Sequence, residues 1–170
     1  MLSAQAQDEI RSEIEKYPKG HARAAVMAAL RIAQNEHGWV SRDVMEHVAD
    51  FLEIEPIKVA EVATFYTMYD LKPVGRHKIS LCTNISCALR GSEGIEKHLR
   101  EKLKIGFGET TKDQRFTLQE VECLAACGGA PAALIDTEYH ENLTPRKIDE
   151  ILDALPRPPK HTQHLSLIHI

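Results

Sequence analysis

The sequence predicts an α/β (α+β) protein in which an N-terminal helical bundle is followed by a small mixed sheet. Apolar residues first recur at helical spacing, then alternate as in strands after the stretch LKPVG, and three prolines end the last helical pattern. We expect a helical domain over residues 1–72, an α/β domain over 73–156, and a disordered tail over 157–170. The closing LSLIHI of that tail resembles foreign sequence joined to the natural C-terminus.

Four amphipathic segments fill the expected helical domain. Gly38 can close the second segment, Ser41 is a suitable N-cap for the third, and Pro56 fits the first turn of the fourth. Short connections between such helices predict a compact antiparallel bundle. The apolar positions that define the segments lie within residues 10–17, 26–33, 44–52 and 59–66.

The second domain alternates between strand and helix patterns. Thr144 is a suitable N-cap for its last helix, with Pro145 at the first helical position. This order of elements predicts a small α/β layer with mixed strand directions. The expected elements are a strand at 78–81, a helix at 92–103, a strand at 116–119, an apolar strand at 131–135, a short edge strand at 138–140 and a helix at 144–155.

Composition excludes some classes of function. The net charge of -4 argues against nucleic-acid binding, because phosphate backbones demand a basic face. No segment approaches the roughly 20 continuous apolar residues that cross a bilayer, so we expect no direct membrane insertion. The first residues lack the features of a secretory signal or a transit peptide, which predicts a cytoplasmic protein. In that reducing compartment, cysteines hold metals or do redox chemistry more often than they form structural disulfides.

The four cysteines form two pairs. Cys82 and Cys87 have the spacing C-x4-C, and Cys123 and Cys127 have the spacing C-x3-C and precede GGAP. Both pairs follow strand-like runs, and the helix and strand between them can return the chain alongside itself. The sequence therefore predicts that four thiolates converge from two loops on one metal site.

Several alternatives compete with an iron-sulfur site at this point. The compartment disfavours disulfides, and the paired spacing disfavours four unrelated core thiols. Structural zinc sites more typically use C-x2-C twice, whereas the wider loops here suit a two-iron cluster. The spacing also differs from the C-x4-C-x2-C of plant-type ferredoxins. Spacing alone thus favours iron over zinc and leaves open an interaction module that zinc stabilises on the same four cysteines.

Four stretches carry a family resemblance that covers the chain to about Leu155. They are TFYTMYDLKPVG, CTNISCALRG, CLAACGGAP and ENLTPRKIDEIL. Together they closely resemble the thioredoxin-like [2Fe-2S] subunit of bacterial NADH:quinone oxidoreductase, respiratory complex I. Related subunits occur in NAD-linked hydrogenases and formate dehydrogenases, so an equivalent diaphorase subunit is the alternative parent.

The resemblance implies a site and a set of partners. Cys82, Cys87, Cys123 and Cys127 would ligate one [2Fe-2S] cluster, one pair on each iron, in a thioredoxin-like domain. The chain would dock against a flavoprotein that binds NADH and FMN, together with other peripheral-arm subunits. It would exchange single electrons with that FMN as part of an oxidoreductase, with no catalytic residue and no flavin or nucleotide site of its own. The complex would hold it on the cytoplasmic side of the inner membrane.

Two positions depart from the family pattern. Ala125 stands where the family usually has glycine, and Gly129 stands where it usually has aspartate or asparagine. If residue 125 needs a positive φ, alanine is strained there. We expect this loop to be slightly repositioned and the hydrogen bonding of the cluster to be altered.

Other conspicuous residues receive ordinary structural interpretations. We expect His77 and His98 at the surface. The helical spacing of the aromatic residues predicts core or interdomain packing for Trp39, Phe65, Tyr66 and Tyr69. The stretch IGFGET at 105–110 lacks the third glycine of a dinucleotide loop, so we predict a plain turn.

Overall fold

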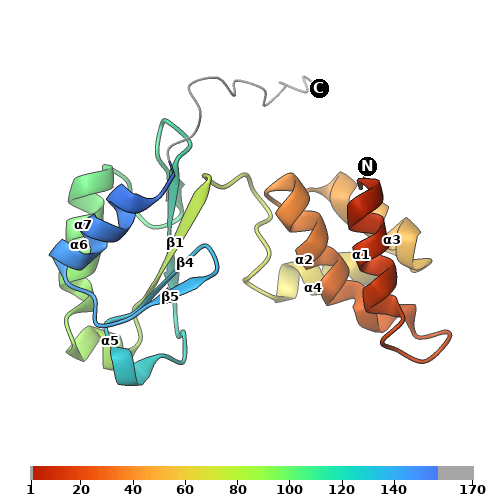
Figure 1. Ribbon diagram of the computed structural model, residues 1–170, viewed down its shortest axis with the longest axis horizontal. Helices are drawn as coiled ribbons and strands as arrows, with labels where there is room; N and C mark the ends of the chain where they lie inside the picture. Colours follow the sequence, from red (N-terminus) through yellow and green to blue (C-terminus); the bar gives the residue numbers. More distant parts are fainter. Residues whose placement is uncertain (1, 157–170) are drawn as a thin grey trace. The chain divides into compact units, whose positions relative to one another are not determined.

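The computed structural model describes residues 2–156, and the chain divides into two compact units, residues 1–73 and 74–170 (Figure 1). The tail predicted for residues 157–170 lies outside the described residues. Over the described part of the chain, none of the helices has the length and apolar character that crossing a membrane requires.

The first unit is helical, as predicted. Ser3 caps the first helix by accepting the N–H of Ala6, and Ser41 caps the third by accepting the N–H of Val44. Gly38 ends the second helix with φ +81°, a conformation that glycine adopts without strain. The elements are α1 (Ala4–Ile14), the 3₁₀ turn η1 (Ala22–Ala25), α2 (Val26–His37), α3 (Arg42–Leu52) and α4 (Pro56–Phe65).

The chain that follows α4 is fastened to α2. Tyr69 is buried, and its hydroxyl donates to the carbonyl of Met27 at 2.9 Å. The Gln34 amide donates to the carbonyl of Met68 at 3.1 Å and accepts the N–H of Asp70 at 2.7 Å. These bonds join residues far apart in sequence, so the segment after α4 belongs to the helical unit. The unit's largest fully buried side chains are Ile10, Leu30, Val40, Val48 and Val59.

The second unit is a five-stranded mixed sheet with the order β2-β3-β1-β4-β5. The central strands β1 and β3 run parallel, and the β1–β4, β2–β3 and β4–β5 pairs are antiparallel. The α/β fold class with mixed strand directions is therefore confirmed. The strands are β1 (His77–Cys82), β2 (Glu109–Thr110), β3 (Phe116–Val121), β4 (Ala133–Ile135) and β5 (Glu138–His140).

Helices α6 (Ser92–Leu103) and α7 (Pro145–Ala154) lie side by side beside this sheet (Figure 1). Asp149 of α7 accepts hydrogen bonds from His98 Nε2 and Lys102 Nζ of α6, each at 2.8 Å. Thr144 caps α7 by accepting the N–H of Lys147. Apolar side chains from the sheet and both helices form one core, which includes Ile79, Leu81, Leu118, Ile135, Ile95, Leu99, Ile148 and Leu152.

Three expectations need correction. His77 is buried, not at the surface, since its Nδ1 lies 2.7 Å from an Asp136 carboxylate oxygen and its Nε2 lies 3.1 Å from the carbonyl of Pro156. Phe65 is 76% exposed, so it does not belong to the core of the helical unit. Hydrogen bonds, and not the Phe65 side chain, order the segment after α4. The stretch 105–110, predicted as a plain turn, ends in the short strand β2 (Glu109–Thr110), because Gly108 donates to the carbonyl of Leu118 and brings the chain beside β3.

Candidate metal centre

The two cysteine pairs leave the sheet at the same edge. Cys82 is the last residue of β1, and it is the register partner of Val121, the last residue of β3. Because the two strands are parallel neighbours, their carboxyl ends meet at one edge of the sheet. Cys123, two residues beyond β3, therefore starts its loop beside the loop that starts at Cys82.

The first loop folds at once into the five-residue helix α5 (Ile85–Leu89). Asn84 caps this turn, and its side-chain oxygen accepts the N–H of Ile85 at 2.7 Å. Cys87 lies on the inner side and is only 2% exposed, whereas Ile85 and Leu89 are 70% and 82% exposed. The helical turn thus buries one thiol and presents two large apolar side chains outward.

The second loop has an irregular backbone. Leu124 and Ala126 are partly buried and pack against the small cluster that contains Cys82 and Cys87, while Cys123 and Cys127 are exposed. Cys127 begins the 3₁₀ turn η2 (Cys127–Gly129). Alternate residues of this loop thus face inward, which leaves its two thiols on the open side.

Ala125 has the strained backbone conformation that its departure from the family glycine predicts. Its φ is +56°, in the left-handed region that disfavours residues with a Cβ. In this conformation its backbone N–H donates to Cys123 Sγ at 3.3 Å.

Hydrogen bonds join the two loops. The N–H of Cys82 donates to the carbonyl of Ala132 at 3.1 Å, and the N–H of Thr83 donates to the carbonyl of Val121 at 3.1 Å. Arg90, just after α5, donates from Nε to the carbonyl of Ala130 at 3.4 Å. Sequence reasoning did not assign this role to Arg90, although the residue lies within the motif CTNISCALRG. The signal that could have found it is a positive side chain directly after a cysteine loop.

The thiols influence one another across the two loops. Burial raises the pKa of the Cys87 thiol, as do a hydrogen bond with Cys82 and the charges of Cys82 and Cys127, while the backbone N–H of Ala132 lowers it. Three of the four predicted ligands are therefore electrostatically linked. A raised pKa keeps the Cys87 thiol protonated, and binding of a metal there would release that proton.

Gly129 leaves room for a side chain from elsewhere in the fold. A Cβ at this position would lie about 2.6 Å from Cβ of Glu141 and would also collide with its carboxyl group. The N–H of Asn142 donates to the carbonyl of Gly129 at 2.5 Å, which holds the segment after β5 against η2. The departure at Gly129 is thus explained by packing, since any larger residue must displace Glu141.

The residues present fit a two-iron cluster. Within residues 2–156, no group of three or more histidine, cysteine or acidic side chains is placed to hold a metal ion, so the structure brings the two cysteine loops to one sheet edge without gathering the four thiols into one ligand set. A [2Fe-2S] cluster asks only for a pair of thiolates at each iron, and the two loops supply one pair each. A backbone N–H directed at sulfur, which stabilises thiolate charge, reaches Cys123 from Ala125.

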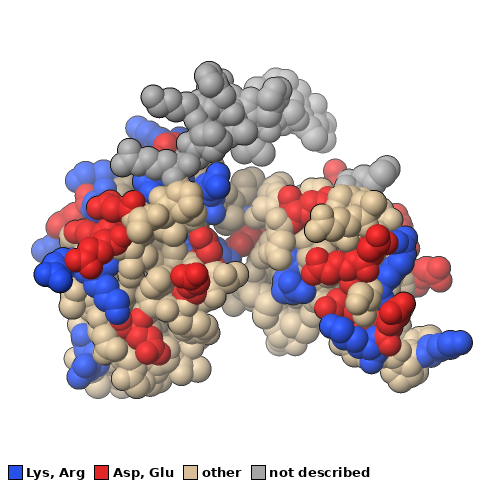
Figure 2. All heavy atoms as spheres, viewed as in Figure 1, with Lys and Arg blue, Asp and Glu red and all other residues tan. Residues whose placement is uncertain are grey.

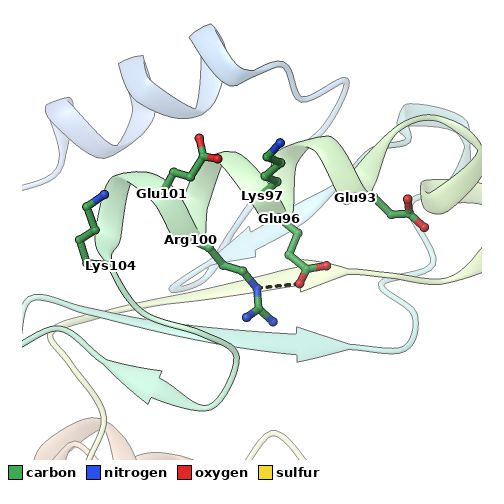
Figure 3. A pocket seen from close by; sticks show the side chains of 6 residues that line it. All are labelled: Glu93, Glu96, Lys97, Arg100, Glu101 and Lys104. Atoms are coloured by element: carbon green, nitrogen blue, oxygen red, sulfur yellow. Dashed lines mark hydrogen bonds and ion pairs between the residues drawn. The ribbon is translucent and has the colours of Figure 1, made fainter.

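A hollow of about 610 Å³ on α6 does not contribute to this site. Figure 3 shows the six charged side chains that line it, all projecting from one helix, with Arg100 paired to Glu96 at 2.7 Å. Acidic and basic side chains are interspersed over this part of the second unit (Figure 2). The hollow contains none of the cysteines and is best described as a solvated helix face. Its lining residues are Glu93, Glu96, Lys97, Arg100, Glu101 and Lys104.

Comparison with known proteins decides the family. The thioredoxin-like [2Fe-2S] ferredoxin family matches residues 10–156. The chain belongs to this family. The expected family and the thioredoxin-like fold are therefore confirmed.

Named relatives of this ferredoxin cover most of the chain. The E subunit of the NADH-quinone oxidoreductase of Rickettsia bellii is 48% identical over 143 residues, which are 84% of this chain and 86% of the relative. The second E subunit of the same kind of oxidoreductase in Rhizobium meliloti is 45% identical over 147 residues, 86% of each chain. Both relatives are subunits of an oxidoreductase complex.

A solved structure shares the fold. A chain of the NAD+-reducing [NiFe]-hydrogenase in the air-oxidized state superposes with a TM-score of 0.66 at 23% identity and covers 75% of this ferredoxin. The ferredoxin spans 22% of that hydrogenase chain, and the likeness concerns the fold alone.

Proposed function

We propose that this protein is an electron-transfer subunit of an NADH:quinone oxidoreductase, in which Cys82, Cys87, Cys123 and Cys127 hold one [2Fe-2S] cluster. The observation that carries the proposal is the meeting of both cysteine loops at one sheet edge. Membership of a [2Fe-2S] ferredoxin family and the relatives from NADH-quinone oxidoreductases support it.

The chain's own residues position and shield the group. When bound, the cluster supplies one-electron chemistry and nothing else. Cys82 and Cys87 would supply the buried pair of thiolates, and Cys123 and Cys127 would supply the exposed pair. Ala130 and Ala132 pack against the buried thiols and exclude water from them. No residue of this chain acts as a general acid, base or nucleophile in the proposed role.

We propose that a flavoprotein subunit carrying FMN and NADH docks close to the cluster, and that residues 1–72 and 73–156 act as a docking domain and a cluster domain. Exposed apolar side chains support the need for partners, because large apolar groups left in solvent mark interaction sites. Ile85 and Leu89 flank Cys87, and Phe65 and Met68 lie at the end of the helical unit. Through these partners the subunit would lie on the cytoplasmic face of the inner membrane.

A spectrum tests the cluster. Anaerobically purified protein should be red-brown, contain two irons and two acid-labile sulfides per chain, as a [2Fe-2S] centre requires, and give its EPR signal after one-electron reduction. Colourless protein that contains stoichiometric zinc would instead identify a zinc module held by the four cysteines and end the cluster proposal.

Purification from the native source tests the partner. Affinity capture of the tagged, full-length chain should bring down a flavoprotein together with NADH-dependent quinone reduction. The same capture separates this parent complex from the alternative, a diaphorase subunit. Capture with hydrogen- or formate-linked NAD reduction would assign the chain to that parent and refute the quinone one.

A further inference from the structure

Two basic side chains contact the C-terminal end of α7. Arg115, directly before β3, donates from Nη2 to the carbonyls of Leu152 and Leu155, at 3.0 and 2.9 Å. His77, the first residue of β1, has its Nε2 3.1 Å from the carbonyl of Pro156. The last carbonyls of a helix have no partner within the helix and carry partial negative charge, so basic groups stabilise them. We call His77 and Arg115 the clasp, because together they fasten the end of α7 to the sheet.

The two members of the clasp respond differently to pH. Arginine stays protonated in proteins, whereas histidine is the side chain whose charge ordinarily changes between about pH 5 and 8. Both members contact the ring of Phe116, with the guanidinium carbon of Arg115 at 4.5 Å from its centroid and the His77 ring at 5.8 Å. Within the clasp, only the contact made by His77 can therefore open as the pH changes.

The partners of the His77 ring decide which of its nitrogens loses a proton. Nδ1 lies 2.7 Å from one carboxylate oxygen of Asp136, whose other oxygen accepts the N–H of Lys78 at 2.9 Å. Because an acceptor faces each ring nitrogen, both contacts are hydrogen bonds only when the imidazole carries both protons. The carboxylate is the stronger acceptor, so the neutral ring keeps its proton on Nδ1 and turns the lone pair of Nε2 toward Pro156. Two acceptors then face each other, and the bond to Pro156 is lost.

No second carboxylate is bonded to the ring among residues 2–156, where Asp136 is the one acidic partner of His77. The acidic residues of the turn before β3 and of the last turns of α7 have other partners; they are Asp113, Asp149 and Asp153. The residues that flank His77 along the chain are both basic, Arg76 and Lys78. The choice of the neutral tautomer therefore depends on Asp136.

We propose that the clasp is a pH-sensitive fastening, in which protonated His77 holds Pro156 and releases it as the pH rises while Arg115 keeps its hold on α7. The sign follows from Nε2, which donates to Pro156 only while it is protonated, so the segment is held at low pH and freed at high pH. His77 and Cys82 are the first and last residues of β1, and about 16 Å of strand separates them. The clasp is thus independent of the cluster, and its failure would leave the proposed function untouched.

NMR spectroscopy of the full-length protein tests the clasp. Long-range ¹H–¹⁵N spectra of the imidazole report the protonation of each nitrogen of His77, and the carbonyl ¹³C shift of Pro156 reports whether that oxygen accepts a hydrogen bond. As the pH rises from about 5 to 9, Nε2 should lose its proton while Nδ1 keeps it. The Pro156 shift should change with the same midpoint. A Pro156 shift that does not follow Nε2, or a ring that loses its proton from Nδ1, would overturn the proposal.

Asp136→Asn provides the sharpest comparison. Its side-chain oxygen can still accept the N–H of Lys78, while its NH₂ group donates to Nδ1 of His77, so the neutral ring keeps its proton on Nε2. The Pro156 carbonyl should then stay bonded over the whole pH range, and its transition should disappear. A transition identical to wild type in Asp136→Asn would contradict the proposal. If this variant does not fold, the wild-type titration still decides.

His98→Gln is the matched control. His98 also binds an aspartate, since its Nε2 lies 2.8 Å from Asp149, but it is a residue of α6 and makes no contact with the clasp. The variant should therefore keep the wild-type transition of Pro156. Loss of that transition in His98→Gln would assign the pH dependence to the pair between α6 and α7 and overturn the role of His77.

Discussion

The two cysteine loops present their thiols by opposite means. The first is regular, with a capped helical turn that carries Cys87 inward, and its two thiols are 3% and 2% exposed. The second has a left-handed alanine, a 3₁₀ turn and two exposed thiols. One loop buries sulfur in an apolar shell, whereas the other leaves its sulfurs exposed and directs the backbone N–H of Ala125 at Cys123 Sγ.

Because of this difference, the two loops contribute differently to the stability of the folded protein. Cysteines in an apolar shell contribute to the folded core even without metal, because buried thiols behave as small hydrophobic groups. Exposed cysteines contribute little to folding, so Cys123 and Cys127 would act only as ligands in the proposed role. We therefore expect variants of the two loops to have the same effect on cluster binding and different effects on the protein without metal.

The largest effect should be loss of the cluster from either loop. Cys82→Ala and Cys127→Ala each remove a thiolate that no neighbouring side chain replaces, so the purified variants should lack visible absorption and EPR signal. His98→Ala should retain both, because His98 pairs with Asp149 on α7 and takes no part in the site. A full cluster in both cysteine variants would show that the ligands are misassigned.

The loops should differ clearly when metal is absent. Cys87→Ser places a hydroxyl in the apolar shell and should lower the free energy of unfolding of the metal-free protein by about 2 kcal/mol, whereas Cys123→Ser at an exposed position should change it by less than about 0.5 kcal/mol. Urea denaturation monitored by circular dichroism measures both. Equal losses of unfolding free energy in the two variants would show that the difference in burial between the loops does not affect stability.

A smaller effect should appear within the second loop. Gly129→Ala would push a methyl group into Glu141 and should cost about 1 kcal/mol of unfolding free energy, the low end for overpacking, because part of the Glu141 side chain can move. Gly128→Ala, one residue earlier, meets no neighbour within 4 Å and should leave stability nearly unchanged. The same urea experiment compares them, and identical midpoints would refute the packing explanation for Gly129.

The smallest effect is an acid dependence that belongs to neither loop. Hydrogen bonds from Lys102 and then His98 hold the pKa of Asp149 below its usual value. The unfolded-state pKa of an aspartate is about 3.9, and at pH values above it the lowered pKa of the folded state stabilises the protein. This stabilisation is lost as the pH falls through the lower, folded-state pKa. Asp149→Asn should therefore weaken the fall of unfolding free energy below about pH 4, measured by urea titrations at several pH values. An unchanged slope would exclude this ion pair as a source of the acid dependence, and Cys123→Ser should keep the wild-type slope.

Local signals sufficed for most elements of the fold. Ser41, Pro56 and Thr144 lie at the helix starts that their chemistry predicts, because caps depend on residues only a few positions apart. His77 was misplaced because its burial depends on Asp136 and Pro156, which are 59 and 79 residues away in sequence. The strand β2 was missed for the same reason, since two residues carry no periodicity and only pairing with β3 defines them.

By itself, the sequence determined the fold class and the two cysteine pairs, which follow from periodicity and spacing, both of which are local. The expectation that Ala125 is strained came from the family resemblance, because it depended on the glycine that the family usually has at this position. Only the tertiary structure decided that Cys82 lies in register with the end of β3, that Arg90 joins the two loops, and that the backbone N–H of Ala125 donates to Cys123 Sγ. The physical reason is that hydrogen bonds and burial at the site join segments which the chain brings together only after the parallel strands have paired.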